Sequence, residues 1–144
     1  MKTNSAGIDL IKSFESCSLN AYQGKKDKLG IITIGWGHVG GYYLGDSVTQ
    51  EEADTILSKD LEHFENGVTN LLTGEVSDNQ FAALVSFSFN LGLGNLKTSH
   101  LLIYTNEGKF DLAADEFVKW NKSNGQVVDG LTRRRLAEKE LYQS

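Results

Sequence analysis

The stretch GKKDKLGIITIGWGHVGG, residues 24–41, differs in character from the sequence on either side of it. It mixes glycines with β-branched and aromatic residues, a composition typical of short strands joined by tight turns. The flanking segments LNAYQ (19–23) and GYYL (41–44) are similar. Together they predict a small antiparallel sheet, which needs a helix to pack against because two or three strands alone are marginally stable.

Helical patterns lie on both sides of these strands. An apolar repeat at helical spacing predicts a first helix over about residues 5–15, with Glu15 near its C-terminal end. After the strands, TQEE (49–52) is a capping box, and Val48 is placed to act as a hydrophobic staple. The apolar stripe behind this box predicts a long helix over about residues 50–72.

The second half of the chain is predicted to be helical. SDNQ (77–80) is another capping box, and FAALVSFSFNL (81–91) is apolar on nearly every side, so it should form the central buried helix. GLGN (92–95) ends it. Shorter helices are predicted near residues 98–106, 111–121 and 131–142. The expected architecture is α+β: a sheet lobe over about 16–48, and a helical lobe over about 70–144 that includes the first helix.

Composition narrows the range of functions. The 144 residues suit one domain, and a net charge of −5 disfavours a nucleic-acid binder. With one cysteine, Cys17, no intramolecular disulfide can form. No nucleotide-binding loop or metal-binding motif is present, so no cofactor or metal is expected. The N-terminal residues lack the apolar run of a signal peptide, from which we expect synthesis in the cytoplasm.

Two carboxylates, Glu15 and Asp27, could face a cleft between the sheet and the helices. A pair of carboxylates across a scissile bond is the usual equipment for glycoside hydrolysis: one is protonated and donates to the leaving oxygen, and the other is ionised. The spacing alone is weak evidence, because 19 acidic residues form many pairs and most lie on solvated surfaces.

A family resemblance gives this pair more weight. Glu15, Tyr22, Asp27, Gly30 and TIGWGH (33–38) look like the phage-type lysozymes of glycoside hydrolase family 24. In that family, a glutamate at the end of the first helix precedes the pattern Y-x-D-x-x-G-x-x-T-I-G-x-G-H. The similarity continues in the family's order over residues 5–142, through DLEHFENGVTNLL, SDNQFAALVSFSFNLGLG, GKFDLAADEFVKWNKSNG and GLTRRRLAEKELY. The resemblance implies a lysozyme-like fold with two lobes joined by the long helix and a cleft between them.

The chain departs from the family pattern in the turn before Asp27. The family aspartate lies two residues after the tyrosine, whereas Asp27 lies five residues after Tyr22. The spacing from Asp27 to Thr33 is unaltered, so the simplest interpretation is a three-residue insertion, GKK (24–26). Loops tolerate insertions, and the unaltered spacing should keep Asp27 in place. Asp129, where many relatives have proline, is interpreted as a loop change.

The resemblance implies a role for each matching residue. Glu15 would be the general acid that protonates the glycosidic oxygen. Asp27 would position or activate a water molecule, or stabilise positive charge on the sugar ring. Thr33 would hold the water through its hydroxyl, and the configuration of the sugar would be inverted. In a different class of interpretation, Thr33 is simply a β-branched residue favoured in a strand.

Other residues have structural and functional interpretations. The resemblance implies that His38 is structural and pairs with an acidic residue on the long helix, and Asp78 at the start of the central helix is one candidate partner. Trp36 and Trp120 are expected to pack in cores rather than on sugars, and Cys17 to be a small packing residue. Candidate substrate contacts, from alignment with cleft positions of relatives or from their place near the cleft, are Val39, Tyr42, Tyr43, Phe89 and Ser99. The arginines of RRR (133–135) are expected to face the cleft or pair with carboxylates, with a solvated face as the alternative.

The leading hypothesis is an endolysin that cuts the β-1,4 bond between N-acetylmuramic acid and N-acetylglucosamine in peptidoglycan. It would be a monomer made in the host cytoplasm, and would need a holin to reach the wall. A lytic transglycosylase would cut the same bond without water, and the presence of Asp27 and Thr33 argues against it. A non-catalytic wall-binding module is the other alternative, and the GKK insertion is the feature that favours it.

Overall fold

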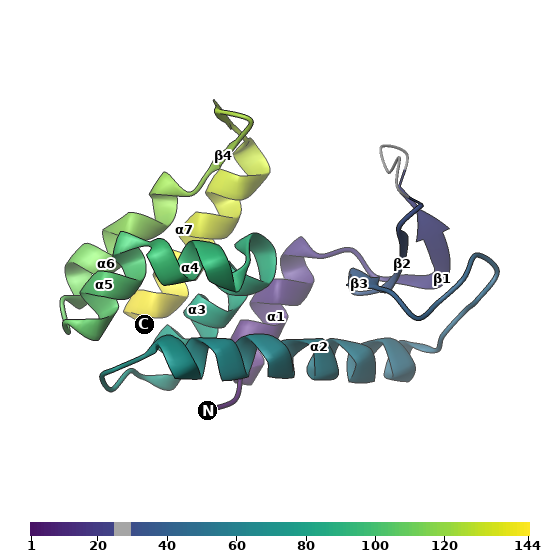
Figure 1. Ribbon diagram of the computed structural model, residues 1–144, viewed down its shortest axis with the longest axis horizontal. Coiled ribbons are helices and arrows are strands. Elements are labelled where there is room, and N and C mark those ends of the chain that lie inside the picture. The colour runs from purple at the N-terminus through teal and green to yellow at the C-terminus, as the bar shows by residue number, and fades with distance from the viewer. Residues whose placement is uncertain (25–29) are drawn as a thin grey trace. The chain divides into compact units, whose positions relative to one another are not determined.

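Helices and one small antiparallel sheet dominate the computed structural model, which describes residues 1–24 and 30–144 (Figure 1). The predicted α+β class is confirmed. The chain forms two compact units, which we call the sheet unit (Lys12–Glu62) and the helical unit (Met1–Ile11 with His63–Ser144).

The sheet has three antiparallel strands in the order β1-β2-β3: Ser18–Gln23, Ile32–Gly35 and His38–Val39. In this register Thr33 of the central strand lies opposite Tyr22 on one side and Val39 on the other. The glycine-rich stretch therefore forms a hairpin, with Trp36 and Gly37 in the turn between β2 and β3.

The prediction of a strand at GYYL (41–44) is wrong, because these residues form a bend and a turn. Gly41 has φ +80°, a left-handed conformation that strands do not use. The short segment 46–48 lies beside β1 instead, where the Val48 N–H donates a hydrogen bond to the Leu19 carbonyl at 2.8 Å. The outer edge of β1 is partly covered in this way.

The sheet packs on the start of helix α2 (Gln50–Leu71). The predicted capping box is present: the Thr49 N–H donates to Glu52 Oε1 at 3.2 Å, and the Glu52 N–H donates to Thr49 Oγ1 at 3.1 Å. Val48 and Ala53 share one buried cluster, as expected for a hydrophobic staple. Helix α2 begins in the sheet unit and ends in the helical unit.

The core of the sheet unit is formed by Ile34, Val48 and Ala53. Cys17 and Trp36 pack against this cluster, which confirms the packing role predicted for both. Because Ile34 is fully buried, its neighbours in β2 face the opposite side of the strand.

Helix α3 (Asp78–Leu91) forms the centre of the helical unit, as predicted, with every residue from Phe81 to Ser88 buried. Its capping box joins Ser77 and Gln80, and the helix ends at Gly92, whose φ is +94°. Helices α4 and α7 pack against α3 (Figure 1).

The remaining elements of the chain are α1 (Ser5–Phe14), α4 (Leu93–Thr98), α5 (His100–Asn106), α6 (Phe110–Glu116), the 3-10 helix η1 (Phe117–Lys119), β4 (Lys122–Ser123), β5 (Gln126–Val127) and α7 (Asp129–Gln143). Helix α4 was not predicted, because a six-residue segment is too short to show a helical repeat. The segment between the predicted helices over residues 111–121 and 131–142 contains the β4–β5 hairpin. Asn124 and Gly125 form its turn, with φ values of 52° and 78°.

Candidate active site

Glu15 follows the last residue of α1 directly and is half-buried. Its carboxylate lies against the turn between β2 and β3. A Cβ atom built on Gly37 would lie 3.4 Å from Glu15 Oε2. Gly37 also has φ +85°, so both its backbone conformation and this close approach favour glycine. The GWGH turn therefore brings the backbone to the candidate catalytic acid.

Thr33 occupies the central strand and is half-buried. Its neighbour Ile34 points into the core, so the Thr33 side chain lies on the opposite face of the sheet. On that face it is flanked across the strands by Tyr22 and Val39, which are both exposed. A hydroxyl in this position can face a ligand without disturbing the core.

Asp27 lies outside the described residues, as do Lys25 and Lys26 of the predicted insertion. The connection that contains them joins Gln23 of β1 to Ile32 of β2, and these two residues are paired in the sheet. The predicted insertion therefore falls between two paired strand ends.

A second acidic residue, Asp54 of α2, holds the turn in place. Its Oδ1 accepts hydrogen bonds from Trp36 Nε1 at 2.8 Å and from Gln50 Nε2 at 3.1 Å, and lies 3.2 Å from Lys12 Nζ. The hydrogen bond from Trp36 is the largest cause that holds the pKa of Asp54 below its ordinary value, and Lys12 adds to it. Sequence reasoning missed Asp54, because only the folded chain brings α2 beside the turn.

His38 has the structural role that was predicted, with a different partner. Its Nδ1 lies 2.8 Å from Asp60 Oδ2 on the long helix α2, and its Nε2 lies 3.0 Å from the Gly40 carbonyl oxygen. The candidate partner Asp78 is therefore wrong, whereas the expected pairing with an acidic residue on the long helix is confirmed by Asp60. This contact fixes β3 to α2.

Three predicted substrate contacts belong to the sheet unit. Val39 is 57% exposed on β3. Tyr42 is half-buried, lies edge-on to His38 with ring centroids 5.9 Å apart, and lines a cavity of about 300 Å³. Tyr43 is 78% exposed. The exposure of Val39 and Tyr43 leaves both available to a ligand.

The other two predicted contacts belong to the helical unit. Phe89 is half-buried and lies edge-on to Phe64, with ring centroids 5.4 Å apart. Ser99 is only 2% exposed and caps α5: its Oγ accepts from the Leu102 N–H at 3.1 Å and donates to the Leu96 carbonyl at 2.7 Å. Contact between Ser99 and a substrate therefore stays a prediction.

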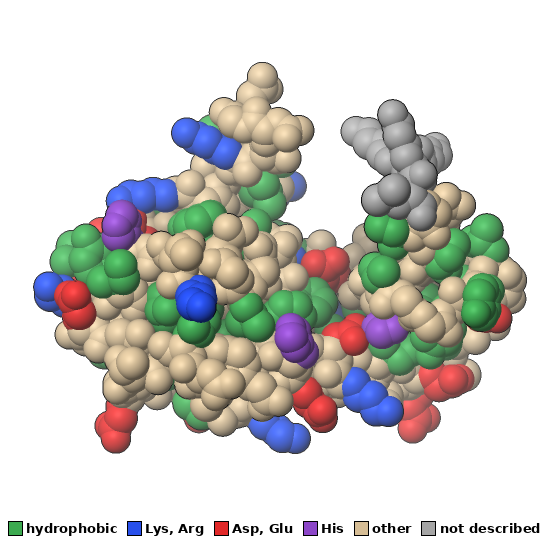
Figure 2. All heavy atoms as spheres, in the orientation of Figure 1, with side chains coloured by type: hydrophobic (Ala, Val, Ile, Leu, Met, Phe, Trp, Pro, Cys, Tyr) green, Lys and Arg blue, Asp and Glu red, His purple; other side chains and the backbone are tan. Residues whose placement is uncertain are grey.

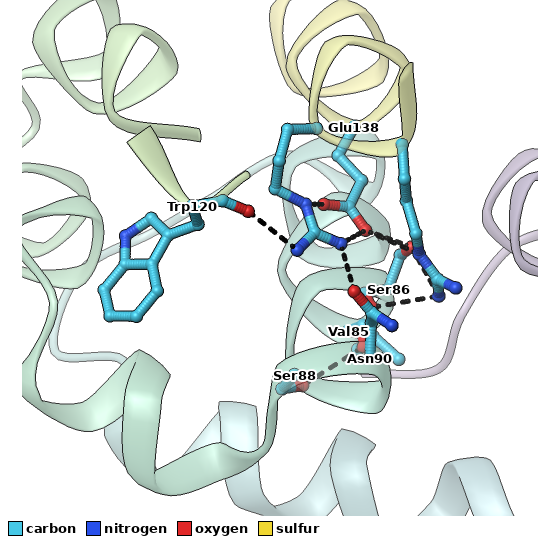
Figure 3. Close-up of polar contacts among 8 residues, drawn as sticks. Val85, Ser86, Ser88, Asn90, Trp120 and Glu138 are labelled. Carbon is cyan, nitrogen blue, oxygen red and sulfur yellow. Dashed lines mark hydrogen bonds and ion pairs between the residues drawn. The ribbon is translucent and has the colours of Figure 1, made fainter. Parts of the chain in front are cut away.

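Arg134 and Arg135 of α7 form a buried polar cluster with Glu138, and Figure 3 shows the polar contacts around this carboxylate. Arg134 Nε lies 3.3 Å from Glu138 Oε2, and Arg135 Nε lies 2.7 Å from Glu138 Oε1. Ser86 Oγ of α3 donates to Glu138 Oε2 at 2.5 Å. The predicted pairing of these arginines with a carboxylate is confirmed, whereas Arg133 is exposed.

Arg135 also joins this cluster to the end of α3 and to the residue that follows η1. Arg135 donates to Asn90 Oδ1 at 2.8 Å and to the Trp120 carbonyl at 3.4 Å. Burial raises the pKa of the Glu138 carboxyl and lowers that of the Arg135 guanidinium, and each group opposes the shift of the other. Because buried charges are stable only when paired, these contacts fix α7 against α3.

Among residues 1–24 and 30–144, no group of three or more His, Cys, Asp or Glu side chains is arranged to hold a metal ion. Within the same part of the chain, no helix has the length and apolar character needed to cross a bilayer.

Comparison with known proteins identifies the family. The sequence model of the family described as phage lysozyme matches residues 12–138. The chain belongs to the phage lysozyme family. It is 46% identical to the endolysin of Bacillus phage B103 over 99% of its length, but it spans only 54% of that protein. It is 38% identical to the endolysin of Acyrthosiphon pisum secondary endosymbiont phage 1, covering 100% of this chain and 99% of that protein.

A solved structure agrees with this family assignment. The muramidase domain of SpmX from Asticaccaulis excentricus matches with a TM-score of 0.90 at 39% identity, covering 99% of this chain and 98% of that one. The predicted lysozyme-like fold is therefore confirmed.

Proposed function

We propose that the protein is an endolysin that hydrolyses the β-1,4 bond between N-acetylmuramic acid and N-acetylglucosamine in bacterial peptidoglycan. The observation that carries this proposal is that the Glu15 carboxylate lies against Gly37. Gly37 is in the turn of the hairpin whose strand β2 carries Thr33. This arrangement occurs in a chain of the phage lysozyme family, which supports a glycosidase rather than an unrelated use of the fold.

In the proposed mechanism, Glu15 is the general acid. It gives its proton to the glycosidic oxygen as the bond from that oxygen to the sugar ring breaks. Proton transfer from a positioned side chain of this kind increases the reaction rate by a factor of about 10²–10⁴.

Asp27 and Thr33 would act on the opposite face of the sugar. Asp27 accepts a proton from the attacking water, and the Thr33 hydroxyl holds that water for attack on the anomeric carbon. The configuration at that carbon is then inverted. An inverting mechanism predicts a separation of about 6.5–9.5 Å between the Glu15 and Asp27 carboxyl groups, which leaves room for the water.

The proposed substrate contacts are Val39 and Tyr42 from the sheet unit, and Phe89 and Ser99 from the helical unit. We also propose that both units form a single lysozyme domain. The family match runs through both units, and the endosymbiont phage endolysin has nearly the same length as this chain.

Access to the wall is a separate part of the proposal. We infer from the family resemblance that the protein accumulates in the cytoplasm of the infected host and depends on a holin for release, acting as a monomer. Expression in bacteria with and without a membrane-permeabilising agent tests this: lysis should follow permeabilisation. Lysis of untreated cells would contradict holin dependence.

The main test is the mass of the fragments released from purified peptidoglycan by the wild type, Glu15→Gln and Asp27→Asn. We expect hydrated muropeptides from the wild type, and a loss of at least about a hundredfold in both variants. Glu62→Gln, at an exposed site on α2, is the control and should keep full activity.

Other outcomes would reject parts of the proposal. Anhydro-muropeptides would indicate a lytic transglycosylase. Full activity of Asp27→Asn would mean that another group handles the water. Binding to the wall without fragment release would indicate a non-catalytic module.

A further inference from the structure

The end of β2 and the turn that follows it, Gly35–Trp36–Gly37, form a segment that its own backbone does not fix. Both glycines have positive φ, +64° and +85°, and glycine adopts many backbone conformations at little cost. Gly37 lies against the Glu15 carboxylate, so a movement of this turn would change the surroundings of the proposed general acid. Contacts from outside the turn must therefore hold it.

The Trp36 indole is held both at its N–H and on its face. Its Nε1 donates a hydrogen bond to Asp54 Oδ1 at 2.8 Å. Lys12 Nζ lies over the ring, 5.2 Å from its centroid, a distance at which an ammonium group is attracted to the π-system. The indole also packs against the buried core of the sheet unit. The side chain between the two glycines is therefore fixed from three directions.

One oxygen atom connects this indole to the helix that precedes Glu15. Lys12 is in the last turn of α1, and its Nζ lies 3.2 Å from Asp54 Oδ1. The same Oδ1 accepts the hydrogen bond from Trp36, which directly precedes Gly37. Asp54 therefore links the two sides of the contact between Glu15 and Gly37. We call Lys12, Trp36 and Asp54 the clamp.

Stability alone is a weak reason for this arrangement. The side chains of Lys12 and Asp54 are 29% and 43% exposed, and ion pairs with this much exposure stabilise a fold only slightly. The geometry of the carboxylate is nevertheless well determined, because Gln50 Nε2 of the same helix also donates to Asp54 Oδ1, at 3.1 Å. A role in holding the turn accounts for these contacts better than a role in stability does.

We propose that Lys12, Trp36 and Asp54 are positioning residues for glycoside hydrolysis, which hold the turn at Gly37 against Glu15 so that the acid meets the glycosidic oxygen. The inference rests on the proposed function, which makes Glu15 the general acid. The clamp acts through Glu15 and does not touch the substrate. All three residues lie in the sheet unit, so the clamp is complete within one compact body.

Two variants of the full chain each remove one side of the clamp. Trp36→Phe keeps an aromatic ring and removes the N–H, and Lys12→Met keeps the length of the side chain and removes its charge. We expect kcat for fragment release from soluble, uncrosslinked peptidoglycan to fall about tenfold or more in each, because a displacement of about 1 Å can cost about a hundredfold. KM should change by less than about twofold, since substrate binding is not altered.

The controls separate positioning from stability. Lys12→Arg is the conservative variant, and it should keep kcat within about threefold of the wild type, because a guanidinium retains the charge and stacks on an aromatic ring. Lys59→Met removes an exposed lysine of α2 in the same unit and should leave kcat unchanged. Every variant is assayed below its own unfolding transition. Wild-type kcat in Trp36→Phe or Lys12→Met would overturn the proposal, and so would equal losses in Lys12→Arg and Lys12→Met.

The Gly37 amide signal in an ¹⁵N–¹H spectrum distinguishes this inference from the proposed function. Lys12 acts on Gly37 through Trp36, so we expect Lys12→Met to shift this signal, and Lys12→Arg and Lys59→Met to leave it near its wild-type position. An unmoved signal in Lys12→Met would overturn the clamp, whether or not the wild type releases fragments. A shifted signal without fragment release by the wild type would reject the proposed hydrolysis and still support the hold of the clamp on the turn.

Discussion

His38 joins the sheet to the long helix α2 through Asp60, with 2.8 Å between His38 Nδ1 and Asp60 Oδ2. The other ring nitrogen lies 3.0 Å from the Gly40 carbonyl oxygen. Both partners are hydrogen-bond acceptors, so the doubly protonated imidazolium can donate to both at once. One side chain therefore fixes β3 and the start of the segment that carries Tyr42.

Removing the charge from Asp60 tests this link. We expect Asp60→Asn to lower the free energy of unfolding by about 1.5–3 kcal/mol, the usual contribution of a hydrogen bond to a charged group. A double-mutant cycle with His38→Gln, measured by urea unfolding, isolates the pair. Glu62→Gln on the same helix is the control, because Glu62 is exposed. A coupling energy near zero would show that the two side chains act independently.

Gly37 lies next to the candidate acid, and an alanine there should disturb it. Gly37→Ala places a Cβ 3.4 Å from Glu15 Oε2 and forces a residue with a side chain to adopt φ +85°. The backbone strain alone costs about 1–2 kcal/mol. Gly41→Ala has similar strain at φ +80°, but its Cβ would meet nothing within 4 Å.

The two variants therefore separate strain from contact. We expect similar losses of stability, and a larger loss of peptidoglycan hydrolysis in Gly37→Ala, because small displacements of a catalytic group are costly. Turbidity assays at a temperature where both variants are folded provide the measurement. Equal activities would mean that the Glu15 carboxylate is not held by the turn.

The ion pair of Asp54 should make stability depend on pH. Its folded pKa is lowered, so between that value and about 4 the unfolded chain binds more protons than the folded one. The stabilisation is then complete above about pH 4 and lost as the pH falls through the folded pKa. Because the side chain is 43% exposed, the contribution is at most about 1 kcal/mol.

Asp54→Asn isolates the charge, since an amide oxygen can still accept from Trp36. We expect its destabilisation to be measurable at pH 6 and to shrink towards pH 2.5 in urea unfolding. Glu75→Gln in the exposed loop before α3 is the control. A difference that grows as the pH falls would contradict the assigned direction of the shift.

The net charge of −5 predicts weak dependence of wall lysis on salt. Basic side chains lie as separate spots on the visible face in Figure 2, rather than as one broad patch. Long-range steering of the enzyme to an anionic wall should therefore be small. The measurement is the initial rate of wall lysis at about 10 mM and about 150 mM NaCl, where the Debye length is about 30 Å and about 8 Å. A tenfold loss at the higher salt concentration would reveal an effective local basic surface.

The sequence predicted the features that depend on local chemistry. Both capping boxes, the long helix and the buried helix α3 follow from residues that interact within a few positions of one another. The errors arose where distant segments meet. The family resemblance placed the partner of His38 on the long helix, but spacing could not single out Asp60, because the partner is set by how α2 packs on the sheet.

Backbone conformation explains two further differences. GYYL (41–44) has the composition of a strand, but Gly40 and Gly41 adopt positive φ and turn the chain. The β4–β5 hairpin did carry a signal, because Asn124 and Gly125 are a typical pair for a tight hairpin turn. The candidate site was predicted through family resemblance, whereas the contacts that hold it, such as Asp54 with Trp36, needed the fold.

The buried cluster around Glu138 gives the largest expected effect on stability. Glu138 is fully buried between Arg134 and Arg135, so Glu138→Gln removes the buried negative charge that pairs with Arg135 and lies beside Arg134. Breaking a buried pair in this way costs about 3–5 kcal/mol. Glu140→Gln, two residues further along α7 and exposed, should cost less than about 0.5 kcal/mol. Urea unfolding of both variants measures the difference. A loss below about 1 kcal/mol in Glu138→Gln would mean that water reaches the arginines and replaces the carboxylate, so that the cluster does not fix α7 against α3.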